Sequence, residues 1–350
     1  MLLDFANPAG TLRFASRFPG PNGAAFYRNV QGLLVSSIGI GTYLGEMDAA
    51  TDLGYTQAVQ GFLVAGANFI DTSLNYRNQR SELSIGAALR QAVDSGEIQR
   101  NEIVIATKAG YLVPDAVPAG VLGSSDVVGG MHSIAPAFLR DQLDRSRRNL
   151  GLATIDIFYL HNPETQLSYM SRTEFLDRIR KAFECLEGLV ADGQIRYYGM
   201  ATWQGFRHRE PSPEALPLED IAELASEIAG PAHHFRCIQL PFNLAMPEAF
   251  ANRVNGENVL DIAARLGISV VASASLYQAR LSRNLPDEIR SKLPGAETDA
   301  QRAIQFVRST PGIAVALVGM STVAHVRENL GLAKVAPLDA VQYLDLYTHS

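Results

Sequence analysis

The chain has 350 residues, a formal net charge of −6 and 47% hydrophobic residues, which is typical of a globular protein with enough apolar material for a large core. No apolar run reaches the ~18 residues of a transmembrane helix, and the lack of a Lys/Arg block argues against nucleic acid as a partner. Asp4 and Asn7 interrupt the stretch where a signal peptide needs a basic and then an apolar run, so we expect a cytoplasmic protein that engages no membrane.

In chain order, residues 1–25 form an N-terminal extension, and the stretches 11–18 and 24–32 suggest a hairpin that plugs one end of the fold. Eight short apolar runs then predict buried strands at 35–41, 68–71, 103–108, 155–161, 195–201, 236–242, 268–274 and 314–319. Amphipathic patterns between them predict helices at 81–93, 136–151, 173–191, 218–229, 258–267 and 298–309. The segment 173–191 is the clearest, because its apolar residues recur at helical spacing and Gly193 follows as a stop signal.

Strands that alternate with helices indicate parallel βαβ units, and eight such units close naturally into a (β/α)8 TIM barrel. We expect a single domain over 1–350, with the barrel at 26–335 and a C-terminal helix or tail at 336–350. The competing architecture is a doubly wound open sheet, which usually carries GxGxxG after its first strand. Here glycines 39, 41 and 45 have the wrong spacing. The long loops 109–135 and 275–297 follow strands, which predicts that they lie on the C-terminal face of the barrel.

Cys185 and Cys237 are the only cysteines, and each lies within an apolar pattern. We expect both to be small core residues rather than a disulfide. The adjacent pair His233 and His234 lacks metal-ligand spacing, and no Cys/His cluster is present, so no metal site is predicted.

Polar residues occur at the ends of three successive predicted strands. Asp71, Lys108 and His161 end the second, third and fourth, and Tyr76 follows Asp71 in the next loop. Each could have an ordinary structural role on its own. Because strand ends converge at the mouth of a barrel, however, the four are expected to share one site.

The chemistry of this quartet is that of a proton donor. A free phenol has a pKa of about 10 and is a poor acid near neutrality. A lysine ammonium stabilises the phenolate, an Asp fixes the lysine, and a histidine can orient a substrate oxygen. Since no side chain can supply hydride, carbonyl reduction here requires a nicotinamide cofactor. A non-redox isomerase or lyase that uses the same Lys and Asp is the alternative.

The segment around this Asp and Tyr resembles the signature of the aldo-keto reductases. The matching positions are Gly66, Phe69, Ile70, Asp71, Thr72, Ser73, Tyr76, Ser81, Glu82 and Gly86, and the resemblance extends over about 26–335. It implies a divergent, bacterial-type member that reduces aldehydes or ketones with NAD(P)H, or oxidises sugars or secondary alcohols in reverse. Tyr76 would be the general acid, Lys108 the group that lowers its pKa, Asp71 the anchor of the lysine and His161 the orienting residue. Ser81 is expected to cap the helix that follows.

The resemblance also implies a cofactor site. Gly41, Thr42 and Tyr43 would contact nicotinamide or substrate, and Gln239 would bind the carboxamide. Glu328 and Asn329 would reach the adenine. The remaining residues of the predicted cofactor set are Asp71, Thr202, Ser273, Leu276, Gln278, Arg280, Gly319, Met320, Ser321 and His325.

Departures from the family pattern concentrate in this cofactor set. Ala201 and Thr202 stand where Ser-Asn is usual, and Ser273 replaces a stacking aromatic, a role that Trp203 could take over. Gly319, Met320 and His325 replace the usual Lys, Ser and Arg near the 2′-phosphate. The Gly-Met-Ser form nevertheless resembles a branch that uses NADPH, and Arg280, Arg283 and Arg327 or a helix N-terminus could hold the phosphate. NADPH is therefore the first expectation and NADH the alternative.

A cofactor-sensing regulatory subunit with vestigial catalysis is the second function that the resemblance allows. For an enzyme, the expected partner is a small carbonyl substrate, and the loops 109–135 and 275–297 and the tail would set its identity. The sequence leaves the substrate and the oligomeric state open.

Overall fold

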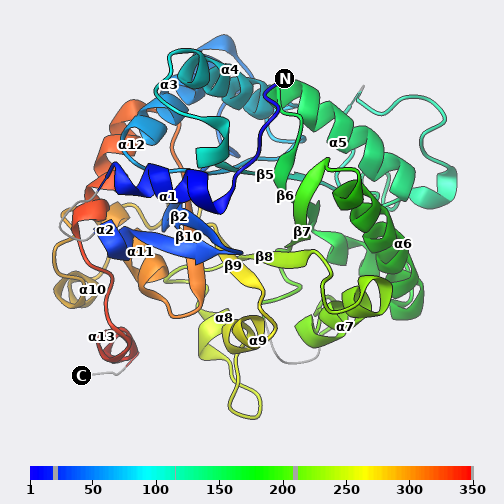
Figure 1. Cartoon of the computed structure of the whole chain (residues 1–350). Coiled ribbons are helices and arrows are strands. Elements are labelled where there is room, and N and C mark those ends of the chain that lie inside the picture. Colours follow the sequence, from blue (N-terminus) through cyan, green and yellow to red (C-terminus); the bar gives the residue numbers. More distant parts are fainter. Residues whose placement is uncertain (19–22, 115, 208–211, 348–350) are drawn as a thin grey trace.

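The computed structural model describes residues 1–18, 23–114, 116–207 and 212–347, and eight parallel strands within them close into a barrel (Figure 1). In barrel order they are β3 (Ile38–Gly41), β4 (Phe69–Asp71), β5 (Val104–Ala109), β6 (Ile155–His161), β7 (Ile195–Ala201), β8 (Phe235–Pro241), β9 (Ser269–Ser273) and β10 (Ile313–Gly319). The barrel closes where 316–319 of β10 pair with 38–41 of β3. The expected (β/α)8 barrel is confirmed, and the doubly wound sheet is excluded.

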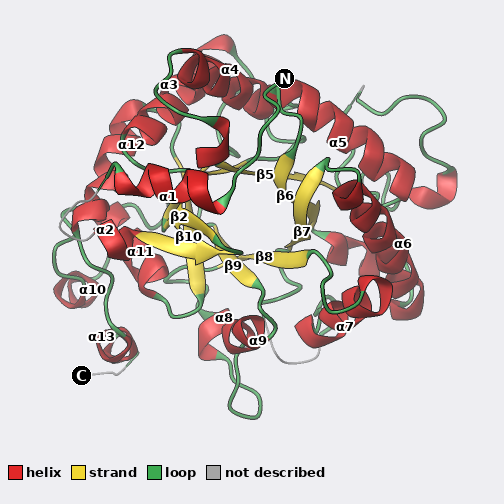
Figure 2. Cartoon of the chain, in the orientation of Figure 1, coloured by secondary structure: helices red, strands yellow, loops and turns green. Residues whose placement is uncertain are grey.

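Helices surround the strands, as the ring of red ribbons in Figure 2 shows. One helix follows each strand: α3 (Ala49–Val64), α4 (Arg80–Asp94), α5 (Pro136–Leu150), α6 (Arg172–Ala191), α7 (Leu218–Ala229), α9 (Val259–Arg265), α11 (Asp299–Ser309) and α12 (Val323–Leu330). Shorter helices are α8 (Glu248–Ala251) and α10 (Asp287–Lys292) in loops, and α13 (Ala340–Asp345) near the C-terminus. None of the helices in the described ranges is long and apolar enough to span a membrane.

The predicted helices agree with the observed ones to within a few residues, but no range was predicted for two of the helices that follow strands, α3 and α12. The buried face of α3 is formed by Tyr55, Ala58, Val59, Phe62 and Leu63. Leu53 and Val64 are also apolar, yet they are exposed to solvent. Because apolar residues lie on both sides of this helix, its sequence lacks the one-sided stripe that identifies an amphipathic helix.

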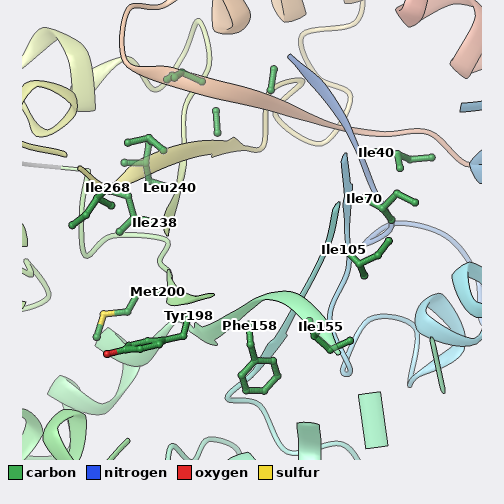
Figure 3. Close-up of a cluster of buried hydrophobic side chains, with 14 of the residues drawn as sticks. Ile40, Ile70, Ile105, Ile155, Phe158, Tyr198, Met200, Ile238, Leu240 and Ile268 are labelled. Carbon is green, nitrogen blue, oxygen red and sulfur yellow. The ribbon is translucent and has the colours of Figure 1, made fainter. Parts of the chain in front are cut away.

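The strands are buried on both faces, which explains why they are continuous apolar runs rather than alternating ones. Figure 3 shows side chains such as Ile70, Ile105 and Phe158 in the layer between strands and helices. A second cluster fills the barrel interior and includes Phe69 and Tyr159. Both cysteines are free and buried, as expected.

The N-terminal region differs from its prediction. The hairpin is formed by β1 (Tyr27–Val30) and β2 (Leu33–Ser36), whereas most of 11–18 belongs to helix α1 (Pro8–Ser16). Asn7 starts that helix by accepting a hydrogen bond from the Gly10 amide, and a proline at the first helical position suits a helix start. A second short helix, α2 (Gly23–Phe26), precedes β1.

The predicted strand 35–41 is in fact two strands. Its first part belongs to β2 in the hairpin and its second part is β3 in the barrel. Hairpin residues Val30, Leu33 and Val35 join the cluster that fills the barrel interior. The hairpin therefore plugs the N-terminal end of the barrel, as expected of the extension, and the opposite end is left for the site.

Candidate active site

The four residues predicted to form one site do lie together at the C-terminal ends of β4, β5 and β6. Lys108 Nζ donates to Asp71 Oδ1 at 2.6 Å, to the Thr72 carbonyl at 2.8 Å and to the Tyr76 hydroxyl at 3.3 Å. Asp71 and Lys108 are buried, and Tyr76 is half-buried at the mouth. The ammonium thus joins a buried carboxylate to a phenol that solvent can reach.

Tyr76 is placed by an unusual turn. Arg77, Asn78 and Gln79 all have positive φ angles, of 50°, 52° and 71°, and the Gln79 amide donates to the Leu74 carbonyl at 2.9 Å. Non-glycine residues rarely adopt this left-handed conformation, least of all three in a row. Tertiary contacts hold the turn, since the Arg77 guanidinium donates to Asp52 Oδ1 at 2.7 Å.

The role expected of Ser81 is wrong. Helix α4 begins at Arg80, and its N-cap residue, Gln79, makes no side-chain capping bond. Ser81 is buried and its hydroxyl donates to the Thr42 carbonyl at 2.7 Å. It ties the loop after β4 to the loop after β3 instead of capping the helix.

His161 is held from two sides at the end of β6. Its Nδ1 lies 3.2 Å from Ser73 Oγ, and its backbone carbonyl lies 2.8 Å from His132 Nε2. Its ring makes an edge contact with the Tyr76 ring, with centroids 5.7 Å apart, and another with Tyr111 at 5.1 Å. Tyr111 and His132 belong to the long loop 109–135, so this loop forms part of the site.

The electrostatics of the site keep the phenol protonated. Burial raises the pKa of Tyr76, and this outweighs the positive charge of Lys108, which lowers it as the sequence suggested. Burial acts to lower the pKa of Lys108, but the charges of Asp71 and Tyr76 outweigh it, so the net pKa is raised and the ammonium persists.

The two histidines are neutral. Burial, with the nearby charge of Lys108, holds the pKa of His161 well below its usual value. Burial likewise lowers the pKa of His132 to about 4. A neutral imidazole carries one N–H and one free lone pair, so His161 can hydrogen-bond a substrate oxygen without adding charge to the site.

The residues expected around nicotinamide adjoin this quartet. Gly41 ends β3 and pairs with Asp71, and Thr42 Oγ1 lies 2.9 Å from Thr72 Oγ1. The Tyr43 ring lies edge-on to the Tyr76 ring at 5.1 Å. Gln239 Nε2 donates to Asp71 Oδ2 at 2.8 Å, so its amide nitrogen already serves the ion pair. The predicted hydrogen bond from Gln239 to the carboxamide stays a prediction, and Gln239 Oε1 is the side-chain atom left to form it.

The remaining predicted cofactor residues lie along the ends of β9 and β10. Ser273 ends β9, and the loop after it contains Leu276, Gln278 and Arg280, with Arg280 over the Tyr277 ring at 5.0 Å. Gly319 ends β10 beside Gly41, and a Cβ built at Gly319 would meet open space. Met320 and Ser321 lead into α12, where His325 is exposed and its backbone amide donates to the capping hydroxyl of Thr322.

The two residues expected at the adenine differ in their availability. Glu328 Oε1 accepts from the Thr298 hydroxyl at 2.7 Å. Asn329 is buried, and its side-chain oxygen has no hydrogen-bond partner among the described residues. A buried carbonyl oxygen without a donor is costly unless a ligand supplies one. Since an adenine amino group is such a donor, this position fits a dinucleotide.

Comparison with known proteins identifies the family. A family model for the aldo/keto reductases matches residues 37–293, well over half of the chain. The chain belongs to the aldo/keto reductase family. The expectation from the signature around Asp71 and Tyr76 is thereby confirmed, and the match places the chain among oxidoreductases.

This aldo/keto reductase has distant relatives. An oxidoreductase of Bacillus subtilis, YqkF, described as uncharacterized, is 22% identical over 304 residues, covering 81% of this chain and 84% of that protein. A D-threo-aldose 1-dehydrogenase from a Pseudomonas species is 29% identical over 146 residues, 39% of this chain and 40% of that enzyme.

Solved structures share the fold. An aldo-keto reductase from Bacillus halodurans in its holo form superposes with a TM-score of 0.66 at 21% identity, covering 93% of this chain and 97% of that one. An aldo/keto reductase from Klebsiella pneumoniae in complex with NADP and acetate has a TM-score of 0.63 at 21% identity, covering 92% and 94%.

Several residues of this reductase's site were not predicted from the sequence. Ser73 was noted only as part of the signature, although it contacts His161. His132 and Tyr111 lie in a loop without periodicity, where no pattern marks them out. Glu164 follows His161 by three residues and contacts the loop after β7. That short spacing after a site residue is the one signal that could have drawn attention to it.

Proposed function

We propose that this aldo/keto reductase catalyses NADPH-dependent reduction of an aldehyde or ketone, with Tyr76 as the proton donor. The observation that carries the proposal is the position of Lys108 Nζ, 2.6 Å from Asp71 Oδ1 and 3.3 Å from the Tyr76 hydroxyl. A protonated phenol beside a fixed cation can release its proton as negative charge develops on a substrate oxygen.

The residues of the site divide the work of one step. When bound, the reduced nicotinamide supplies the hydride that the carbonyl carbon gains. Tyr76 gives its hydroxyl proton to the carbonyl oxygen, which becomes the alcohol, and Lys108 stabilises the phenolate left behind. Asp71 keeps the ammonium in place, and its second oxygen is held by Gln239. Neutral His161 orients the substrate oxygen.

Features at the dinucleotide positions support NADPH as the cofactor. Asn329 offers a buried acceptor that has no partner among the described residues, and Ser321 precedes Thr322, the N-cap of α12, so a helix N-terminus that suits a phosphate lies next to it. Arg280 is exposed and supplies positive charge in the loop after β9. The Klebsiella pneumoniae relative was solved with NADP. NADH remains the alternative, because the usual Lys, Ser and Arg are replaced here.

A titration tests the cofactor preference. The protein is titrated calorimetrically with NADPH and NADH, and NADPH is expected to bind more tightly. Arg280→Ala should weaken NADPH about tenfold or more, as for loss of one charge-assisted phosphate contact, and leave NADH unchanged. Arg253→Ala is the matched control, since Arg253 pairs with Asp261 in a different part of the molecule. Tighter binding of NADH would overturn the preference for NADPH.

The reaction itself is tested by following cofactor oxidation with aromatic, aliphatic and sugar carbonyls. Because one relative is an aldose dehydrogenase, the screen also includes the reverse reaction, oxidation of aldoses with NADP. Turnover of at least one carbonyl or alcohol is expected. Tight cofactor binding without turnover across the whole panel would contradict the proposal and point to the regulatory alternative, and absence of nicotinamide binding would point to a non-redox enzyme.

A further inference from the structure

Glu164 makes a concentrated set of hydrogen bonds outside the catalytic quartet. It lies in the short 3-10 segment after β6 (Pro163–Ser168) and is 3% exposed. Its Oε1 accepts from three successive backbone amides, those of Trp203 at 2.6 Å, Gln204 at 3.0 Å and Gly205 at 3.5 Å. The carboxylate therefore binds the loop after β7 through its main chain.

No cation compensates this carboxylate within the part of the chain that the structure describes. None of the ion pairs between described residues involves Glu164, and its Oε2 has no hydrogen-bond partner among them. Burial raises its pKa, and hydrogen bonds from backbone amides act against that. A buried carboxylate of this kind is not a general source of stability, because its desolvation costs about as much as its bonds return. Its role is to hold in place the three backbone amides that donate to it.

The loop that Glu164 binds is attached to the catalytic residues on both sides. The Asn162 amide, next to His161, donates to the Ala201 carbonyl at 2.7 Å. The Thr202 amide donates to the Gln239 carbonyl at 2.9 Å, and Gln239 in turn holds Asp71. Thr202 Oγ1 accepts from the Phe206 amide at 3.3 Å, which closes the loop on itself.

The end of β7 and this loop carry one of the departures from the family pattern. Ala201 and Thr202 stand where Ser-Asn is usual, so fewer side-chain groups can hydrogen-bond the carboxamide. Trp203 is 38% exposed at the same strand end. The short bond from the Trp203 amide to Glu164 fixes the backbone at this residue and therefore the direction in which its side chain leaves the chain.

We propose that Glu164 is a positioning residue that holds residues 202–205 in one arrangement, so that Trp203 and Thr202 form a fixed wall at the nicotinamide end of the site. The proposal rests on the proposed function for what this wall contacts, but the restraint itself is a property of the protein without cofactor.

The chain supplies its own probe, because Trp203 is its only tryptophan. Its emission spectrum, anisotropy and acrylamide quenching report this loop alone. Glu164→Ala removes the acceptor, and Glu164→Gln keeps the shape and one carbonyl oxygen but removes the charge. Glu187→Gln is the matched control, because Glu187 also accepts from a backbone amide, that of His234, just before β8 at the opposite end of the barrel.

In Glu164→Ala we expect red-shifted emission, lower anisotropy and about twofold or greater acrylamide quenching. We also expect NADPH binding weaker by about tenfold, since one charge-assisted hydrogen bond corresponds to roughly that factor. Glu164→Gln should show the same changes to a smaller extent. KM for the cofactor should rise with little change in kcat, whereas a merely structural defect would lower the active fraction and leave KM unchanged. Glu187→Gln should match the wild type in all readouts.

Two outcomes would overturn the proposal. One is wild-type Trp203 quenching and anisotropy in both Glu164 variants, and the other is altered fluorescence with unchanged NADPH affinity. If Glu164→Ala does not fold, Glu164→Gln decides between them. Failure of the carbonyl screen alone would count against the proposed function and not against this restraint, because the fluorescence of the free protein needs no turnover.

Discussion

Replacing Lys108 by methionine should destabilise the protein through the carboxylate that remains. The change removes the donor that lies 2.6 Å from Asp71 Oδ1 and 2.8 Å from the Thr72 carbonyl, while Asp71 stays 3% exposed. Breaking a buried ion pair from one side costs about 3–5 kcal/mol. Because Gln239 still donates to Asp71 Oδ2, we expect the lower end, about 3 kcal/mol.

A double-mutant cycle separates the interaction free energy of Lys108 and Asp71 from the effects of the two single substitutions. Asp71→Asn removes the carboxylate charge and should also destabilise the protein, because Lys108 then lacks its counter-charge. The double variant leaves neither charge, so its cost should be smaller than the sum of the single costs by about 2 kcal/mol, within the range for residues in contact. A coupling free energy of about 2 kcal/mol is what we expect from the 2.6 Å contact between Lys108 Nζ and Asp71 Oδ1.

Urea unfolding followed by far-UV circular dichroism measures these differences, provided that the slopes of the transitions agree. Ser95→Ala is a suitable reference, since this hydroxyl only donates to a nearby helix carbonyl. Additive single costs, or a Lys108 variant as stable as the wild type, would refute the view that the two charges stabilise each other in the buried site.

Three further predictions follow from the geometry. Because the pKa of Tyr76 is raised, the acid form persists, so kcat/KM for reduction should be flat from about pH 6 to 9 and fall only as pH rises above about 10; a fall centred near pH 7 would contradict this. In Gly110→Ala, the new methyl group would overlap the His161 carbonyl oxygen and crowd His132 Nε2. We expect unfolding measurements to show about 1–3 kcal/mol of destabilisation, and steady-state kinetics to show a kcat/KM about tenfold lower. Wild-type values in both would show that His161 need not be fixed. Asn329→Leu should weaken NADPH binding, measured by calorimetry, by about tenfold. The cofactor-free variant should be at least as stable as the cofactor-free wild type. Unchanged NADPH affinity would exclude Asn329 from the adenine site.

The barrel could be predicted from the sequence because its strands and most of its helices have strong local signals. Strands buried on both faces are short apolar runs, and helices such as α6 have one apolar stripe. Helix α3 could not be identified this way, since Leu53 and Val64 are apolar and exposed. The N-terminal hairpin was misplaced because 11–18 contains both helical and strand-forming residues, and its helical start depends on the capping contact of Asn7.

That Asp71, Tyr76, Lys108 and His161 lie together was predictable, because each ends a strand or follows one closely and the barrel brings strand ends together. His132, Tyr111 and Glu164 act through contacts across loops that no sequence spacing encodes. The direction in which the pKa of Tyr76 shifts could not be predicted without the structure. Burial raises this pKa and the charge of Lys108 lowers it, and burial has the larger effect.

Tyr76→Phe tests most directly whether Tyr76 is the proton donor. Phenylalanine keeps the ring that contacts Tyr43 and His161 and removes only the hydroxyl that lies 3.3 Å from Lys108 Nζ. Single-turnover oxidation of bound NADPH by the best carbonyl substrate should fall by at least about a hundredfold, the lower range of a general-acid contribution, with NADPH affinity nearly unchanged. Hydride transfer at the wild-type rate in Tyr76→Phe would contradict the account.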